Sequence, residues 1–261
     1  GSPGKGKTSF LVNLLYGFWQ KGLRVVFYTL EMRRMEILNR LFAVYLLDER
    51  DADMTWTEIY AFMRSDNARD IIRNKIAPFI HIKEQNEGEE FTEESLMHYY
   101  EYYKYRKGFE PDVVIVDYFQ RLKPSHNVLA QRGVAMTHQV NSLTKFALHT
   151  SASWIVAAQK NRAGADLGSN ALTSAKGTAA FEEDAALMVH TDRHIGPGFY
   201  DVLRCDVPKN RFGPNPTAYL KIHKSMAAII GQTDEEEVRS WKEKKKKKKQ
   251  EASEDITHDA S

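Results

Sequence analysis

The sequence predicts an α/β fold, with a mostly parallel central sheet flanked by helices. Two observations predict it. Short runs of β-branched and apolar residues alternate with longer stretches of helical periodicity, and a late run of strands follows. A glycine-rich phosphate-binding motif also stands directly before a helical stretch, which is the arrangement of folds built from strand–loop–helix units.

The first elements follow from apolar spacing. Residues 9–21 carry apolar side chains at helical intervals up to Gly22, a natural helix stop. Residues 23–30 are rich in β-branched and aromatic side chains, which is typical of a buried strand. The pattern over residues 32–77 predicts mostly helix, and residues 79–82 predict a short strand.

The second half continues the alternation. Thr92 can cap a helix that runs to about residue 107, since a threonine oxygen accepts hydrogen bonds from free helix N–H groups. Residues 112–116, Asp-Val-Val-Ile-Val, form the clearest strand of the chain. A helix over residues 134–150 and a strand over residues 154–158 come next. Three further strands are expected near residues 186–190, 201–207 and 218–222.

We assign residues 1–231 to one domain and residues 232–261 to a disordered charged tail. The tail holds DEEE and six consecutive lysines at 244–249, and such charge blocks bury too little apolar area to fold. The domain opens at Gly1 on the phosphate-binding motif. In phosphate-loop folds a buried strand precedes that loop, so we expect the first strand of this domain to lie before Gly1.

The composition excludes several classes of protein. An apolar fraction of 42% is ordinary for a globular chain, and no run of eighteen apolar residues suggests a membrane span. Cys205 is the only cysteine, which excludes an internal disulfide framework and favours a reducing compartment. The N-terminus does not resemble a signal peptide. We therefore expect a cytoplasmic protein in which Cys205 is a small buried apolar residue.

The strongest motif occupies the first eight residues and matches the complete G-x-x-x-x-G-K-[ST] pattern. Its backbone N–H groups would surround the phosphates of a nucleoside triphosphate. Lys7 would reach the β- and γ-phosphates, and the Thr8 hydroxyl would bind Mg²⁺. The predicted nucleotide-binding residues are Gly1, Ser2, Pro3, Gly4, Lys5, Gly6, Lys7, Thr8 and Ser9.

Three strand ends supply further candidates. Asp117 follows the strongest strand, where a carboxylate next to a phosphate loop holds Mg²⁺. Glu31 follows the strand at 23–30 and could orient and deprotonate an attacking water, although its position alone favours a surface glutamate. Gln159 could sense the γ-phosphate, and a plain loop residue fits its spacing equally well.

Six blocks, in order, resemble the replicative DNA helicases of the DnaB type, which share a RecA-like core. They cover roughly residues 1–223. Leu-Glu-Met at 30–32, Ala-Gln-Lys-Asn-Arg at 158–162 and the segment ending in Phe-Glu-Glu-Asp-Ala at 185 are three of them. The others are GSPGKGKTSF at 1–10, Val-Asp-Tyr-Phe-Gln at 116–120 and Lys-Asn-Arg-Phe-Gly-Pro at 209–214.

The resemblance implies roles for these residues. Glu31 becomes the catalytic carboxylate and Gln159 the γ-phosphate sensor, while Lys209 and Arg211 form a finger that enters the site of the neighbouring subunit. It further implies a homo-hexameric ring that hydrolyses ATP with Mg²⁺, translocates 5′ to 3′ on single-stranded DNA, and works with a primase and a helicase loader. The host would be a bacterial or phage-infected cell.

The predicted DNA contacts coincide with a concentration of positive charge. Seven Lys or Arg residues and a single acid lie between Arg121 and Phe181, a plausible footprint for the phosphate backbone. The family's DNA-facing loops fall at about 121–132 and 163–178. The candidate DNA-binding residues are Arg121, Lys123, Arg132, Arg162, Lys176 and Gly177.

Two other functions compete with a helicase motor. Lys-Asn-Arg-Phe-Gly at 209–213 is also a motif of RadA, a recombination ATPase of the same superfamily. A KaiC-like protein would use the same core as a nucleotide-binding regulatory module. Lys176-Gly-Thr-Ala at 176–179 departs from the Arg-Glu-Ser-Gly of the DnaB family: it keeps one cation and replaces the acid and the last glycine.

Overall fold

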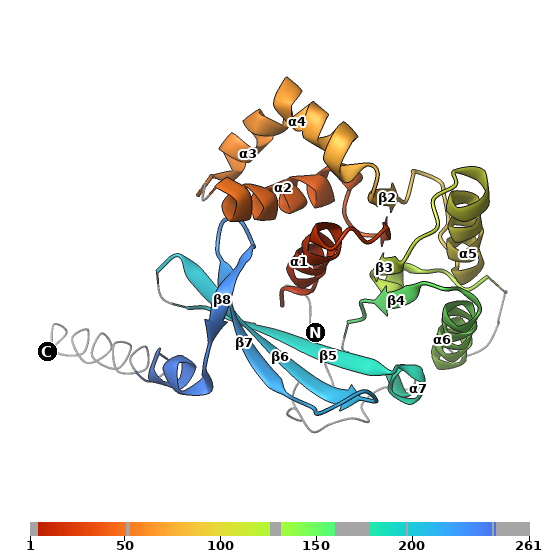
Figure 1. Ribbon diagram of the computed structural model, residues 1–261. Coiled ribbons are helices and arrows are strands. Elements are labelled where there is room, and N and C mark those ends of the chain that lie inside the picture. The colour runs from red at the N-terminus through yellow and green to blue at the C-terminus, as the bar shows by residue number, and fades with distance from the viewer. Residues whose placement is uncertain are drawn as a thin grey trace, which may run out of the picture.

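Four early strands form a parallel sheet and four late strands form an antiparallel one (Figure 1). The computed structural model describes residues 5–50, 53–125, 132–159, 178–196, 198–241 and 243. The early strands are β1 (Val25–Thr29), β2 (Ile80–Glu84), β3 (Val113–Asp117) and β4 (Ser153–Val156). The late strands are β5 (Leu187–His194), β6 (Tyr200–Asn210), β7 (Thr217–His223) and β8 (Ile229–Thr233).

The parallel sheet has the order β2-β1-β3-β4, and the predicted α/β fold with a parallel sheet and flanking helices is confirmed. The late strands were expected to complete the same pattern. They form instead a meander in the order β5-β6-β7-β8, because each is joined to the next by a short turn that favours antiparallel pairing. Among the described strands, β4 pairs only with β3.

The helices lie on both faces of the parallel sheet (Figure 1). Short π-helical turns, Ile72–Ile76 and Tyr102–Arg106, extend α4 and α5. The helices are α1 (Lys7–Gln20), α2 (Arg34–Arg50), α3 (Trp56–Met63), α4 (Asp66–Ile71), α5 (Glu93–Glu101), α6 (Arg132–His149) and α7 (Thr178–Asp184).

Alternate side chains of the central strands enter two different cores. Val25 and Phe27 of β1 pack with buried side chains of α1 and α2, whereas Val26 and Tyr28 pack with those of α5 and α6. Because successive strand residues point to opposite faces, a strand that is buried on both sides reads as one continuous apolar run. This accounts for the strength of the signals at 23–30 and 112–116.

The predicted cap at Thr92 is confirmed. Its hydroxyl accepts from Ser95 N at 3.1 Å, and the Ser95 hydroxyl accepts from Thr92 N at 2.8 Å, which forms a reciprocal capping box at the start of α5. A second box joins Thr55 and Glu58 at the start of α3.

The predicted start of the disordered tail at residue 232 is wrong for residues 232–241. β8 runs to Thr233, and residues 235–241 are helical. Asp234 caps that helix, Val238 is buried, and the Trp241 ring packs on Tyr200 at 5.6 Å. The acidic pattern concealed these contacts, because one valine and one tryptophan are enough to anchor a short helix. Residues 244–261 lie outside the described residues.

Cys205 is 5% exposed on β6, and burial raises the pKa of its thiol to about 11. The thiolate is the reactive form of cysteine, so the native protein should react with iodoacetamide at pH 8 only on the timescale of unfolding. Labelling followed by mass spectrometry checks this, with the denatured protein as the fully reactive reference. Equal labelling rates in the native and denatured protein would contradict the burial of this thiol.

In the described part of the chain, no helix combines the length and the apolar character that a membrane crossing requires.

Candidate nucleotide-binding site

The phosphate loop leads into α1 through Gly6. Gly6 precedes the first helical residue, Lys7, with φ +81°, a left-handed conformation that favours glycine. A Cβ at this position would lie 2.8 Å from Leu203 Cδ1 of β6. Residues 1–4 of the predicted nucleotide-binding set lie outside the described residues, and the Ser9 side chain is buried at the start of α1.

We expect Gly6→Ala to weaken nucleotide binding about tenfold or more, because the left-handed conformation alone costs about 1–2 kcal/mol with a side chain present. The contact with Leu203 adds to that cost. Titration with a fluorescent ATP analogue measures the effect. Gly17→Ala is the matched control, since nothing lies within 4 Å of a Cβ at that helical position. An unchanged Kd for Gly6→Ala would show that the turn tolerates alanine.

Lys5 and Lys7 of the loop have different surroundings. Lys5 forms a 2.8 Å ion pair with Asp192 of β5, and both side chains are about half exposed. The loop is thus tied to the antiparallel sheet. Lys7 faces the parallel sheet: burial lowers the pKa of Lys7, while the charges of Asp117 and Glu31 raise it. These two carboxylates are therefore close enough to act on the Lys7 ammonium.

The Thr8 hydroxyl donates to Asp117 Oδ2 at 2.8 Å, across 109 positions of sequence. Asp117 ends β3, is 1% exposed, and its backbone oxygen accepts at 2.8 Å from the N–H of Leu30, the residue after β1. Burial raises the pKa of Asp117 and the nearby Glu31 raises it further, whereas Thr8, Lys7 and Arg40 lower it. Asp117 Oδ1 is buried and accepts no hydrogen bond among the described residues.

The predicted pair Glu31 and Gln159 lies at the same edge of the parallel sheet. Glu31 is exposed in the bend after β1 and lines a pocket of about 230 Å³ with Met32 and residues 84–87. Gln159 follows β4, and its backbone is fixed by Gln120: Gln120 Nε2 donates to Gln159 O at 3.0 Å, and Gln159 N donates to Gln120 Oε1 at 3.0 Å. Sequence reasoning missed the contact that Gln120 makes, because the only sequence signal at Gln120 is its place in the motif at 116–120.

A second pocket, of about 490 Å³, lies between α2 and the turns of the antiparallel sheet. Met32 lines both pockets. Arg40 also lines the second one, and its guanidinium lies 5.8 Å from the Trp56 ring. Burial lowers the pKa of Arg40, whereas the charges of Glu36, Tyr60 and Asp117 raise it. Asn39 Oδ1, on the same wall, is buried and has no hydrogen-bond partner among the described atoms. Sequence reasoning missed Arg40 and Asn39, because one polar turn within a long helix carries no motif.

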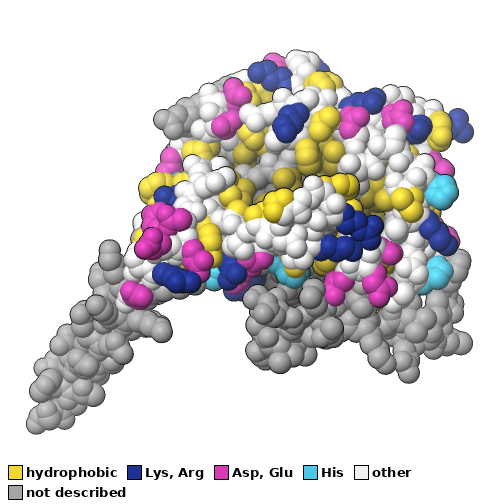
Figure 2. All heavy atoms as spheres, turned by 60° about the horizontal axis from the view of Figure 1, so that its bottom comes forward, with side chains coloured by type: hydrophobic (Ala, Val, Ile, Leu, Met, Phe, Trp, Pro, Cys, Tyr) yellow, Lys and Arg dark blue, Asp and Glu magenta, His cyan; other side chains and the backbone are white. Residues whose placement is uncertain are grey.

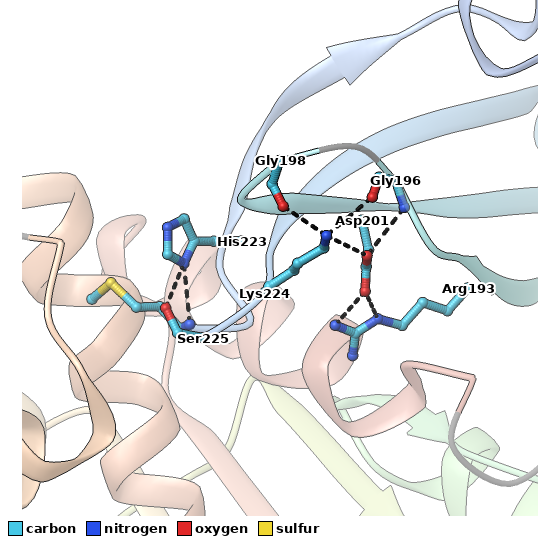
Figure 3. Close-up of polar contacts among 8 residues, drawn as sticks. Arg193, Gly196, Gly198, Asp201, His223, Lys224 and Ser225 are labelled. Atoms are coloured by element: carbon cyan, nitrogen blue, oxygen red, sulfur yellow. Dashed lines mark hydrogen bonds and ion pairs between the residues drawn. The ribbon is translucent and has the colours of Figure 1, made fainter. Parts of the chain in front are cut away.

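A buried carboxylate shapes the opposite wall of this second pocket (Figure 3). Asp201 Oδ2 accepts from Arg193 Nε and Nη2, both at 2.8 Å, and Asp201 Oδ1 accepts from Gly196 N at 3.1 Å. Lys224 Nζ donates to the oxygens of Gly196 and Gly198 at 3.0 and 2.6 Å. The network holds two pocket-lining cations, Arg193 and Lys224, at fixed positions.

Lys209 lies in β6 and Arg211 follows that strand, and both side chains contact the C-terminus of α7. Lys209 Nζ donates to the backbone oxygens of Glu182 and Glu183, and Arg211 Nη2 donates to Glu183 O at 2.8 Å. Lys209 is half-buried, whereas Arg211 is exposed.

The described part of the DNA-binding set is small. Arg121 and Lys123 are exposed just after β3, and Lys123 pairs with Glu90. The side chain of Arg132, at the start of α6, lies outside the described residues, as do Arg162, Lys176 and Gly177. Figure 2 shows Lys and Arg interspersed with Asp and Glu across the face turned forward there.

The chain is similar to known proteins in sequence and in structure. The DnaB-like helicase C-terminal domain family matches residues 1–230. A separately solved ATPase domain is similar at a TM-score of 0.68 and 18% identity, over 89% of this chain and 82% of that one. A DnaB-like replicative helicase, solved in a study of its interactions with primase, gives the same TM-score and identity, and the match spans 57% of its length. At this identity the two structures show a shared fold. No curated protein matches the sequence.

Proposed function

The chain belongs to the family of DnaB-like helicase C-terminal domains, so it is a DnaB-like helicase motor with a RecA-like fold, and on that premise we propose that it hydrolyses ATP to translocate on single-stranded DNA and unwind the duplex. The observation that carries the proposal is the 2.8 Å contact between Thr8 and Asp117 beside Lys7. A hydroxyl, a carboxylate and an ammonium from two separate elements meet where a phosphate loop ends. This is the arrangement that binds a metal-bound triphosphate.

Mg²⁺ fits the donors present. The Thr8 hydroxyl and Asp117 would hold it, and the partnerless Asp117 Oδ1 is a free acceptor for a metal-bound water. Among the described residues, no group of three or more His, Cys, Asp or Glu could form a metal site of its own. Phosphate oxygens and waters would complete the coordination. When bound, the ion would neutralise charge on the phosphate oxygens.

The chain's own residues would then act on the γ-phosphate. Lys7 binds its oxygens, and Glu31, an exposed carboxylate near Lys7, orients and deprotonates the attacking water. Gln159 reports the state of the γ-phosphate to Gln120, to which it is bonded in both directions. In this assignment Gln120 positions Gln159.

The second pocket would take the nucleoside. Trp56 and Tyr60, with ring centroids 6.4 Å apart, offer apolar surface to a base, and Asn39 Oδ1 offers an unused acceptor. Arg40 lines this pocket and its charge interacts with that of Asp117, so its guanidinium would bind phosphate oxygens of the same nucleotide.

We further propose a homo-hexamer in which Lys209 and Arg211 complete the site of the neighbouring copy, because a guanidinium on the γ-phosphate stabilises the transition state. The DNA-binding set would face single-stranded DNA and move along it 5′ to 3′. A primase and a helicase loader are the expected protein partners, and a bacterial or phage-infected cytoplasm is the expected location.

A forked duplex separates the candidate functions. A helicase motor should show ATP turnover that rises with single-stranded DNA, and it should unwind a fork that carries a free 5′ tail. A RadA-like protein would instead move a branched recombination intermediate. A nucleotide-binding regulatory module would show no DNA stimulation, and that result would overturn the proposal.

A further inference from the structure

The last turn of α7 holds both cations of the finger. The oxygens of Glu182 and Glu183 accept from Lys209, and Glu183 O also accepts from Arg211 at 2.8 Å. The last carbonyls of a helix have no partner within the helix and carry partial negative charge, so they attract cations. The backbone joins the two elements as well, since Arg211 N donates to Ala186 O at 2.9 Å.

Two contacts fix α7 itself. Thr144 Oγ1 of α6 donates to Asp184 Oδ2 at 3.0 Å. The Phe181 ring meets Phe119 edge-on, with the ring centroids 4.7 Å apart. Phe119 is 1% exposed and lies two residues after Asp117, so α7 rests on the segment that leaves the Mg²⁺ site. α7 therefore contacts both the segment that follows Asp117 and the cations offered to the next subunit.

We propose that α7 is the positioning element of the finger and that Thr144, through Asp184, is a positioning residue for hydrolysis in the neighbouring subunit. This inference rests on the proposed function. Arg211 uses one of its five N–H donors on Glu183 O and remains exposed, so the other donors stay available for a phosphate. A long side chain that is held at one point loses less freedom when it binds.

The inference predicts an effect on rate and none on nucleotide affinity. Thr144→Val keeps the shape of the side chain and removes the hydroxyl. We expect kcat for ATP turnover on single-stranded DNA to fall about three- to tenfold in the full protein, with the Kd for ATP changed less than about twofold. Thr144→Ser, which retains the hydroxyl, is the matched control and should keep kcat within about twofold of the parent.

A double-mutant cycle separates positioning from general damage. If Thr144 acts through the finger, Thr144→Val should add nothing once Lys209→Ala and Arg211→Ala are both present, because the two groups that it positions are gone. A further loss of rate when Thr144→Val is added to that pair would overturn the inference. So would an unchanged kcat in Thr144→Val, or a rise in the Kd for ATP that matches the loss of rate. A normal rate in Arg211→Ala alone would instead refute the proposed finger, which is a separate outcome.

Discussion

Lys7→Ala is expected to reduce ATP turnover at least about 10³-fold, to the background of the assay, because it removes the cation that meets the β- and γ-phosphates. Lys7 occupies the first turn of α1 within the influence of Asp117 and Glu31. Burial lowers the pKa of this ammonium, so a positive charge at this position costs the folded protein free energy. Charged groups in such unfavourable surroundings are frequent at sites where the charge takes part in binding or catalysis.

Lys5→Ala is the matched control for that prediction. Lys5 belongs to the same motif but pairs with Asp192, at 2.8 Å and about half exposed. An exposed pair of this kind contributes little to stability, roughly 0–1 kcal/mol, so we expect a loss of turnover below about tenfold. Phosphate release measures both variants, and circular dichroism checks that both are folded. Equal losses in the two variants would show that the loop has lost its shape.

The parallel sheet could be predicted from the sequence because its central strands are buried on both faces. β1 and β3 are buried at every position, so each appears as a run of four apolar or aromatic residues before a final polar one. β8 was missed for the opposite reason: Ile230, Gly231 and Gln232 are exposed, and the strand exists through its pairing with β7. Edge strands of that kind depend on a partner that sequence pattern does not reveal.

The candidate site divides in a similar way. Lys7, Thr8 and Asp117 could be predicted because phosphate and metal chemistry restricts both their types and their spacing. Arg40, Asn39 and the Asp201 network could not, since tertiary contact alone brings α2 and the turns of the antiparallel sheet to one pocket. The carbonyl contacts of Lys209 and Arg211 were equally hidden, because backbone oxygens leave no mark in a sequence.

Arg211→Ala should lower DNA-stimulated turnover by about 10³-fold, as the loss of a transition-state guanidinium does in other NTPases. The Kd for ATP should change little, because the side chain lies at the end of α7 and the proposed function assigns it to the neighbouring copy. Arg239→Ala is the matched control: Arg239 is an exposed arginine whose partner is Glu235, one helical turn away, and its removal should leave turnover intact.

Mixed assemblies test where Arg211 acts. If the finger serves the adjacent subunit, each Arg211→Ala copy disables a site that belongs to a normal neighbour. Copies that carry Arg211→Ala and copies that carry Lys7→Ala, each inactive alone, should therefore regain turnover when they are mixed, because a site with an intact Lys7 then receives Arg211 from a Lys7→Ala neighbour. No recovery of turnover in the mixture would place Arg211 in the site of its own chain. The Thr8 and Asp117 site would then have to bind and hydrolyse ATP without the adjacent copy.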